Sequence, residues 1–152
     1  MALTSPFALL FNKLIEKITA DAADIRFIDQ DWSQLDFQDP PISYPCALID
    51  FPETNFTQMQ GYQDGNATVR IKLIYRSFTS TSNITSGTNR ETALQFYELE
   101  QQLYAALQAW DADGLLINDL VRQSATTEKR DDGLRVRVID FACSFNDKSV
   151  TG

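Results

Sequence analysis

Histidine is absent from the 152 residues of this sequence. Without histidine, a chain acting alone has no Ser-His or Cys-His nucleophile pair, no HExxH zinc site and no imidazole to move protons near pH 7. Most hydrolases that work at neutral pH depend on one of these arrangements. An enzyme built from this chain would need Asp, Glu, Tyr, Lys or Cys for its chemistry, and we expect a protein that is not an enzyme.

Motifs that hold phosphate groups, cofactors and metal ions are missing as well. None of the six glycines is followed by lysine, and neither G-x-G-x-x-G nor G-x-S-x-G occurs. Residues 29–40 begin like a calcium loop, but the sixth position is Gln34 instead of glycine and the twelfth is Pro40 instead of glutamate. We expect no cofactor and no metal. A two-carboxylate glycosidase is a remote alternative, because residues 21–64 are rich in acids.

Cysteine is scarce: Cys46 and Cys143 lie far apart, each inside an apolar run. We expect two buried free thiols, with a disulfide between neighbouring strands as the alternative. The first residues lack the basic region of a signal peptide. No run approaches the ~18 consecutive apolar residues of a membrane span. The sequence therefore predicts a protein without a membrane segment, in a reducing compartment.

Basic residues are outnumbered, 13 to 21, and the net charge of −8 is unevenly spread. Residues 21–64 hold nine acids and one arginine, whereas residues 65–152 are nearly balanced. A face that binds nucleic acid would need the opposite sign. The plain interpretation is a solvated acidic surface. The sharper hypothesis is an acidic surface that faces another subunit or a lumen, formed by Asp29, Asp31, Asp36 and Asp39.

Apolar residues at intervals of three and four predict two helices. The first covers residues 6–20, with Thr4 or Ser5 as cap and Pro6 in the first turn. The second covers residues 89–110. Its predicted capping box runs from Thr88 to Glu91, and Gly114 is its predicted stop. Its predicted core stripe is Phe96, Leu99, Leu103, Leu107 and Trp110, broadened by Tyr97 and Tyr104.

Strand patterns occupy most of the remainder. Residues 66–76 alternate most clearly, with apolar side chains on one face and Thr68, Arg70, Lys72 and Arg76 on the other. Further strands are expected at residues 25–29, at 45–51 and near 54–60, the last followed by a turn at 61–65.

The C-terminal part predicts a hairpin of residues 117–129 and 134–145, joined by a tight turn at Asp132-Gly133. The apolar residues of its second strand change from even to odd positions. A β-bulge at Val138-Ile139 would explain the change. Alternatively, the strand changes its buried face where it meets a neighbouring subunit. Residues 146–152 form a polar tail.

Two segments are candidates for contacts with partners. Residues 30–41 form an extended acidic segment, in which Trp32, Leu35 and Phe37 either pin the segment to the domain or form a hook for a partner. Residues 77–89 form a long polar loop, a length that indicates function or disorder. The loop and the hairpin tip are also open to the plain interpretation of exposed loops. The partner-contact candidates are Thr79, Ser80, Thr81, Asn83, Ile84, Thr85, Lys129, Arg130, Asp131 and Asp132.

Together these elements predict one α+β domain over residues 1–152, with a single mostly antiparallel sheet packed against two amphipathic helices and a C-terminal hairpin. The basic strand residues are either a solvated face with cross-strand acids or a contact for another subunit's acidic surface. The candidates for this subunit interface are Arg70, Lys72, Arg76, Arg135 and Arg137.

The order and character of five segments carry a resemblance: the N-terminal helix, residues 44–49, 69–75 and 97–107, and the hairpin end at 135–141. Over residues 5–146 the chain resembles tail terminator and tail-completion proteins of long-tailed bacteriophages and prophages, and related head–tail neck proteins. The resemblance implies a hexameric ring that caps the tail tube, stops its growth and docks to the head connector.

The resemblance also implies the partners: copies of the same chain, the tail tube protein and the head-completion or connector protein. DNA would pass through the ring without specific binding, and the protein would be assembled in the bacterial cytoplasm and carried in the virion. One alternative is another neck or tail component of a phage or of a phage-derived contractile injection system. A second is a small acidic regulatory or ligand-binding domain, and an enzyme is the third.

Overall fold

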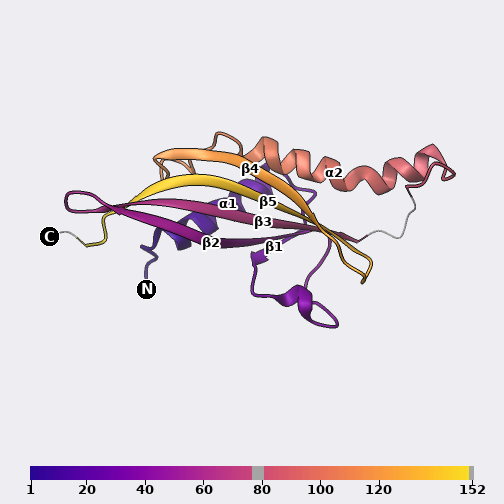
Figure 1. Cartoon of the computed structure of the whole chain (residues 1–152), viewed down its shortest axis with the longest axis horizontal. Helices are drawn as coiled ribbons and strands as arrows, with labels where there is room; N and C mark the ends of the chain where they lie inside the picture. The colour runs from indigo at the N-terminus through magenta and orange to yellow at the C-terminus, as the bar shows by residue number, and fades with distance from the viewer. Residues whose placement is uncertain (77–80, 151–152) are drawn as a thin grey trace.

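The computed structural model describes residues 1–76 and 81–150. Its elements, in chain order, are α1 (Pro6–Asp21), β1 (Phe27–Gln30), the 3-10 turn η1 (Gln34–Asp36), β2 (Cys46–Gln58), β3 (Gln63–Arg76), α2 (Gly87–Leu107), β4 (Asn118–Glu128) and β5 (Leu134–Asp147). The strands form one sheet in the order β1-β2-β3-β5-β4, and only β1 and β2 are parallel. The expected α+β fold, with its two helices and C-terminal hairpin, is confirmed (Figure 1).

The main core lies between the sheet and both helices. Leu10, Leu14 and Ile18 of α1 are at most 1% exposed, and they meet Leu103 and Leu107 of α2 in the same cluster. The strand residues of this cluster come from alternate positions, because successive side chains of a strand point to opposite faces. They include Ala47, Ile49, Val69, Ile71, Leu73, Ile139 and Phe141.

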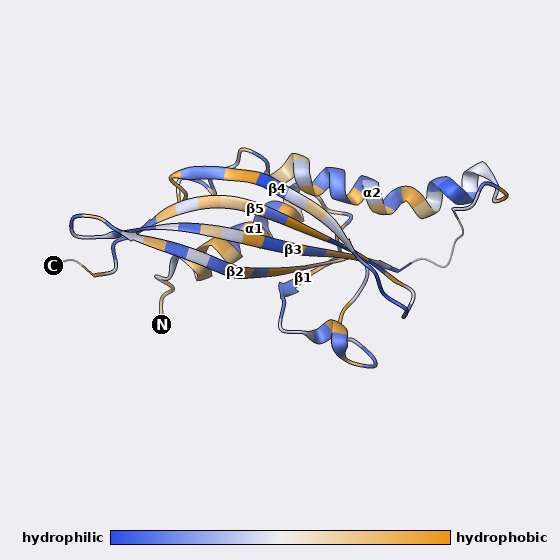
Figure 2. Ribbon diagram, viewed as in Figure 1, coloured by the Kyte–Doolittle hydropathy of each residue, from blue (hydrophilic) through white to orange (hydrophobic). Residues whose placement is uncertain are grey.

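A second, smaller core lies on the opposite face of the sheet, under residues 31–45, which we call the connector. Leu35 of the connector packs against Leu48 of β2, Ile74 of β3 and Val136 of β5. Apolar residues dominate the strands at this end, whereas polar residues are frequent toward the β2–β3 tip (Figure 2). The helices therefore cover one face, and the connector covers one end of the other.

This second core explains the change of phase in β5, and the bulge predicted at Val138-Ile139 is wrong. β5 pairs with β3 in unbroken register from Leu134 to Asp147. Leu134 and Val136 face the connector, whereas Ile139 and later odd positions face the helices. The chain's own connector covers the second apolar stretch, so no neighbouring subunit is needed there.

Two further boundaries differ from the sequence prediction. The separate strands expected at 45–51 and near 54–60 are one strand, β2, with an irregularity between Asp50 and Glu53. Pro52 lies in this irregularity and has no N–H to donate to the ladder. The turn predicted at 61–65 lies at residues 59–62 instead, and Gly65 is an interior residue of β3 paired with Phe145.

The helix ends also need correction. Ser5 precedes α1, but its side chain makes no capping hydrogen bond. The cap of α2 is Ser86, whose Oγ accepts from the Asn89 N–H at 3.3 Å, so the capping box from Thr88 to Glu91 is wrong. α2 ends at Leu107 instead of near Gly114. The chain turns there because the Ala109 N–H donates to the carbonyl of Leu120, which starts the path into β4.

Candidate assembly surfaces

The hairpin tip between β4 and β5 is tied to the connector by Arg130. Its guanidinium donates to the Leu35 carbonyl at 3.0 Å, to the Glu128 carboxylate at 3.0 Å and to the Asp132 carboxylate at 2.8 Å. Only 17% of the Arg130 side chain is exposed. Of the four predicted contact residues at this tip, Arg130 and Asp132 are thus engaged within the chain, whereas Lys129 and Asp131 are exposed.

Lys72 extends this network across the connector face of the sheet. Its Nζ lies 3.4 Å from the Glu128 carboxylate and 3.7 Å from the Asp31 carboxylate. The Asp31 carboxylate also accepts from the Ser33 N–H at 3.1 Å, within the connector. Ion pairs of Lys72 therefore connect the connector, β3 and β4 at the same end of the sheet as the second core.

The pKa values of the network follow from these contacts. Burial of the Glu128 carboxyl raises its pKa, but the hydrogen bond from Arg130 and the charge of Lys72 outweigh burial and leave the pKa below its usual value. The hydrogen bond from Arg130 lowers the pKa of Asp132. The same bond raises the pKa of Arg130, against the opposing effect of burial. Both carboxylates are therefore charged at neutral pH.

The five basic strand residues do not share one face, which corrects the placement expected from the sequence. Arg70, Lys72 and Arg76 occupy even positions of β3 and face the connector side. Arg135 and Arg137 occupy odd positions of β5 and share the helix side with Ile139. The two strands pair one to one without a bulge, so the parity of each residue decides its face. Their role at a subunit interface stays a prediction.

Several of these basic residues have partners within the chain. Arg70 binds both Asp140 oxygens, at 2.9 and 3.0 Å. Arg137 binds both carboxylate oxygens of Glu100 in α2, the longer contact at 3.3 Å, and its guanidinium lies 5.8 Å from the Tyr97 ring centre. Arg135 is exposed, and the described residues offer it no ion pair. Arg135 is therefore available for a partner.

A groove of about 380 Å³ separates the first half of α2 from the β4–β5 hairpin. Leu94 and Tyr97 line it from the helix and are 39% and 53% exposed. Lys129 and Arg135 line it from the hairpin. Sequence reasoning assigned Tyr97 to the core stripe and did not select Leu94. The first turns of α2 extend past the end of the sheet (Figure 1).

The connector presents two aromatic rings to solvent on the opposite face of the sheet. Trp32 is 50% exposed and Phe37 52% exposed, and their ring centres are 5.3 Å apart in an edge-to-face arrangement. Leu35 between them is 4% exposed and packs into the second core. Leu35 therefore pins the connector to the domain, whereas Trp32 and Phe37 are exposed. A role of the two rings as a hook for a partner stays a prediction.

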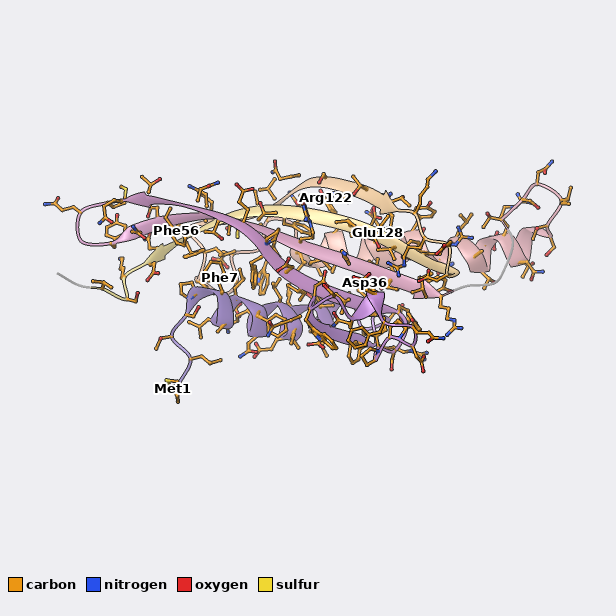
Figure 3. The ribbon with its side chains drawn as sticks, turned by 60° about the horizontal axis from the view of Figure 1, so that its bottom comes forward. Met1, Phe7, Asp36, Phe56, Arg122 and Glu128 are labelled. Carbon is orange, nitrogen blue, oxygen red and sulfur yellow. The ribbon has the colours of Figure 1, made fainter. Side chains whose placement is uncertain are left out.

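Of the four acidic residues predicted to face a lumen or another subunit, two have partners within the chain and two are exposed. Asp29 accepts from the Gln30 N–H and from the Trp32 indole, and Asp31 is paired with Lys72. Asp36 and Asp39 are exposed and have no ion pair among the described residues. Asp36 is labelled at η1 in Figure 3, with Glu128 at the end of β4. The available negative charge therefore lies beside Phe37.

The last part of the loop predicted at 77–89 is helical, because α2 already begins at Gly87. Of its predicted contact residues, Thr79 and Ser80 lie outside the described residues. Thr81 and Asn83 are exposed, and Ile84 is 91% exposed. Thr85 is partly covered, since its carbonyl accepts from Arg90 at 3.0 Å. A contact role for this segment stays a prediction.

The two cysteines are free and buried, as expected. Cys46 belongs to the connector-side core and Cys143 to the helix-side core, so the sheet separates them. Burial raises the pKa of Cys46 to about 12 and that of Cys143 to about 11, which keeps both thiols protonated. Within residues 1–76 and 81–150, no cluster of acids and cysteines could hold a metal ion, and no helix is long and apolar enough to cross a membrane.

Comparison with solved structures gives chains of the same fold. A chain in the virion of a native gene transfer agent particle superposes with a TM-score of 0.61 at 10% sequence identity. The match covers 95% of this chain and 99% of that chain. No protein-family model and no curated protein matches the sequence. The likeness therefore concerns the fold, along nearly the full length of both chains.

Proposed function

We propose that this chain is a structural, non-enzymatic component of a phage-like virion. The observation that carries the proposal is the shared fold with a chain of the gene transfer agent virion, over 99% of that chain. Because the match leaves almost nothing of either chain uncovered, the whole domain, rather than a common substructure, is what the two have in common. Fold alone does not define function, so the surfaces carry the rest of the argument.

Within such a particle, the chain would form a ring, with six copies as the expected number, at the head-proximal end of a tail tube. The ring would stop tube growth and dock to the head-completion or connector protein. Two different exposed surfaces, the groove beside α2 and the aromatic rings of the connector, suit head-to-tail contacts between identical subunits. The acidic stretch at residues 21–64 suits passage of DNA without binding, because like charges repel the phosphate backbone.

If the chain were instead a ligand-binding domain, we would expect a pocket between the sheet and the helices. The side chains of Leu10, Leu14, Ile18, Leu103 and Leu107 fill that layer and are at most 1% exposed. The groove of about 380 Å³ lies outside this packed layer, between α2 and the β4–β5 hairpin. Its lining residues Leu94 and Tyr97 are 39% and 53% exposed, so it is open to a macromolecular partner.

The native mass of the purified chain, with electron microscopy of the same sample, tests the proposal. A ring of about six copies that binds the end of purified tail tubes is the expected result. Tubes assembled without the chain should grow to variable lengths, and tubes assembled with it should stop at a defined length. A strict monomer that leaves tube length unchanged would contradict the proposed function.

A further inference from the structure

A buried side chain fixes the backbone that carries the aromatic rings of the connector. Gln34 has no exposed surface, and its amide oxygen accepts from the Trp32 N–H at 2.8 Å while its amide nitrogen donates to the Gln30 carbonyl at 2.8 Å. Ser33, between Trp32 and Gln34 in the sequence, adopts a left-handed φ of 71°. We call Trp32, Phe37 and the adjacent Asp36 and Asp39 the aromatic knob. The buried Gln34 thus holds the backbone on which the two rings stand.

Such preorganisation is typical of binding anchors. Aromatic side chains that are rigid before binding lose little conformational entropy in a complex and often dominate interface energies. A surface in contact with water alone does not need two half-exposed aromatic rings packed edge to face. Flexible polar residues would cover it with a smaller loss of side-chain conformational entropy. The structure of the connector therefore indicates a partner for the knob.

The groove beside α2 has the complementary chemistry. Its exposed apolar part is Leu94 and Tyr97, and its free positive charge is Lys129 and Arg135. The floor is fixed, because Arg137 is held by Glu100 and by the Thr127 hydroxyl at 2.9 Å. Within residues 1–76 and 81–150, none of Lys129, Arg135, Asp36 and Asp39 has an ion pair. An apolar surface with two such cations therefore matches two aromatic rings with two such carboxylates.

We propose that the aromatic knob of one copy inserts into the groove of a second copy. The occupant is the same chain, because knob and groove match in polarity and in charge, two carboxylates against two cations. Neither Trp32 nor Phe37 lines the groove of its own chain, although Arg130, which does line it, donates to the Leu35 carbonyl of the connector. The contact joins two different patches, so it is head-to-tail and builds a ring when the rotation closes. This inference rests on the proposed function and names its subunit contact.

The knob would anchor the interface without forming all of it. Stable interfaces bury about 1,200–2,000 Å² in total, whereas two aromatic residues bury about 150–250 Å² each. The exposed Ile84, which precedes α2, and the first turns of the helix would supply further contact around the groove. The charged pairs at the rim would fix orientation, and the rings would supply most of the affinity.

Charge reversal gives the first test. The groove variant Lys129→Glu/Arg135→Glu and the knob variant Asp36→Lys/Asp39→Lys should each weaken self-association by more than ~10-fold, because like charges would meet at the contact. The variant with all four changes has the wild-type net charge and should recover association. Arg26→Glu/Lys148→Glu is the matched control. It has the same net charge as the groove variant, changes exposed residues elsewhere and should associate like the wild type. Analytical ultracentrifugation measures all four.

Cysteine cross-linking gives the second test, because both native thiols are buried. A Phe37→Cys chain mixed with a Leu94→Cys chain should form a disulfide-linked heterodimer under mild oxidation. Phe37→Cys mixed with Val121→Cys, an exposed position of β4, should form none. Cross-linking that is equal in both mixtures would overturn the contact.

The outcomes separate the inference from the proposed function. A ring that survives both reversals overturns the knob-in-groove contact and leaves the virion role standing. A dimer or open filament that depends on knob and groove supports the contact and overturns the ring. A wild-type chain that stays a monomer at all concentrations, without cross-links, overturns both.

Discussion

Arg130 is the residue on which the hairpin tip and the connector both depend, and its replacement by alanine should destabilise the fold. The substitution removes hydrogen bonds to the Leu35 carbonyl, Glu128 and Asp132. Because the two carboxylates are about one third exposed and screened by water, we expect a cost of about 1–2 kcal/mol in the free energy of unfolding. Urea denaturation measures it.

Asp131→Ala, one residue further along the same turn, is the control. Its side chain is exposed and has no partner among the described residues, so its effect should stay within about 0.5 kcal/mol. Equal destabilisation by the two variants would mean that the turn itself, and not the Arg130 side chain, holds the tip.

The carboxylates of the same network predict how stability depends on pH. The pKa values of Glu128 and Asp132 are lowered in the folded state. Their contribution is therefore complete above the unfolded pKa values of about 4 and is lost as the pH falls through the lower folded values. The difference in unfolding free energy between wild type and Arg130→Ala should shrink from pH 7 to pH 2. A difference that is independent of pH would contradict the assigned charge network.

Residue identities were readable from the sequence, but their partners were not. The excess of acids, the unpaired cysteines and the candidate cations were all visible in the chain. Which face each cation occupies depends on the parity and register of β3 and β5, which single-sequence periodicity does not provide when a strand has apolar residues on both faces. For that reason the sequence alone places Arg135 and Arg137 in one group with Arg70.

At the scale of elements, the close pairing of β3 and β5 at Gly65 makes a specific prediction. A Cβ at Gly65 would lie 2.7 Å from Cζ of Phe145, the residue paired with it. Phe145 is 2% exposed, and its ring centre lies 5.3 Å from that of Phe7 and 6.3 Å from that of Phe56, so its ring has little room to move. Phe7 and Phe56 are labelled in Figure 3. Gly65→Ala should cost about 1–3 kcal/mol by overpacking.

A double-mutant cycle with Phe145→Leu isolates this contact. In the Phe145→Leu background the space beside Gly65 is larger, so Gly65→Ala should cost clearly less than in the wild type. Asn66→Ala, at the next and exposed position, should be close to neutral. Additive costs in the cycle would show that Gly65 is needed for its backbone and not for the ring above it.

Helices and strands were predictable as elements, because amphipathic periods of 3.6 and 2 are local properties. Their ends were not. Gly65 reads as a turn residue in Asp64-Gly65-Asn66, and only the ring of Phe145, far away in sequence, explains it inside a strand. The stop of α2 at Leu107 likewise depends on the bond between Ala109 and Leu120.

At the scale of the whole molecule, two tryptophans report on the two faces of the sheet. Trp110 packs against the helix-side core, whereas Trp32 belongs to the connector on the other face. β2, β3 and β5 contribute residues to both cores, so the two faces should unfold together. In Trp32→Phe and in Trp110→Phe, urea transitions followed by fluorescence and by far-UV circular dichroism should coincide.

Leu35→Ala is the variant expected to break this coincidence. Leu35 anchors the connector in the second core, and its loss should cost about 2–5 kcal/mol locally, leaving the helix-side core intact. With Trp110→Phe in the same chain, Trp32 fluorescence should then change at lower urea than the circular dichroism signal. If the second core cannot unfold separately from the rest of the fold, Leu35→Ala should instead shift the fluorescence and circular dichroism transitions equally. Because the knob is fixed by the same connector, an early connector transition should also abolish self-association before the sheet unfolds.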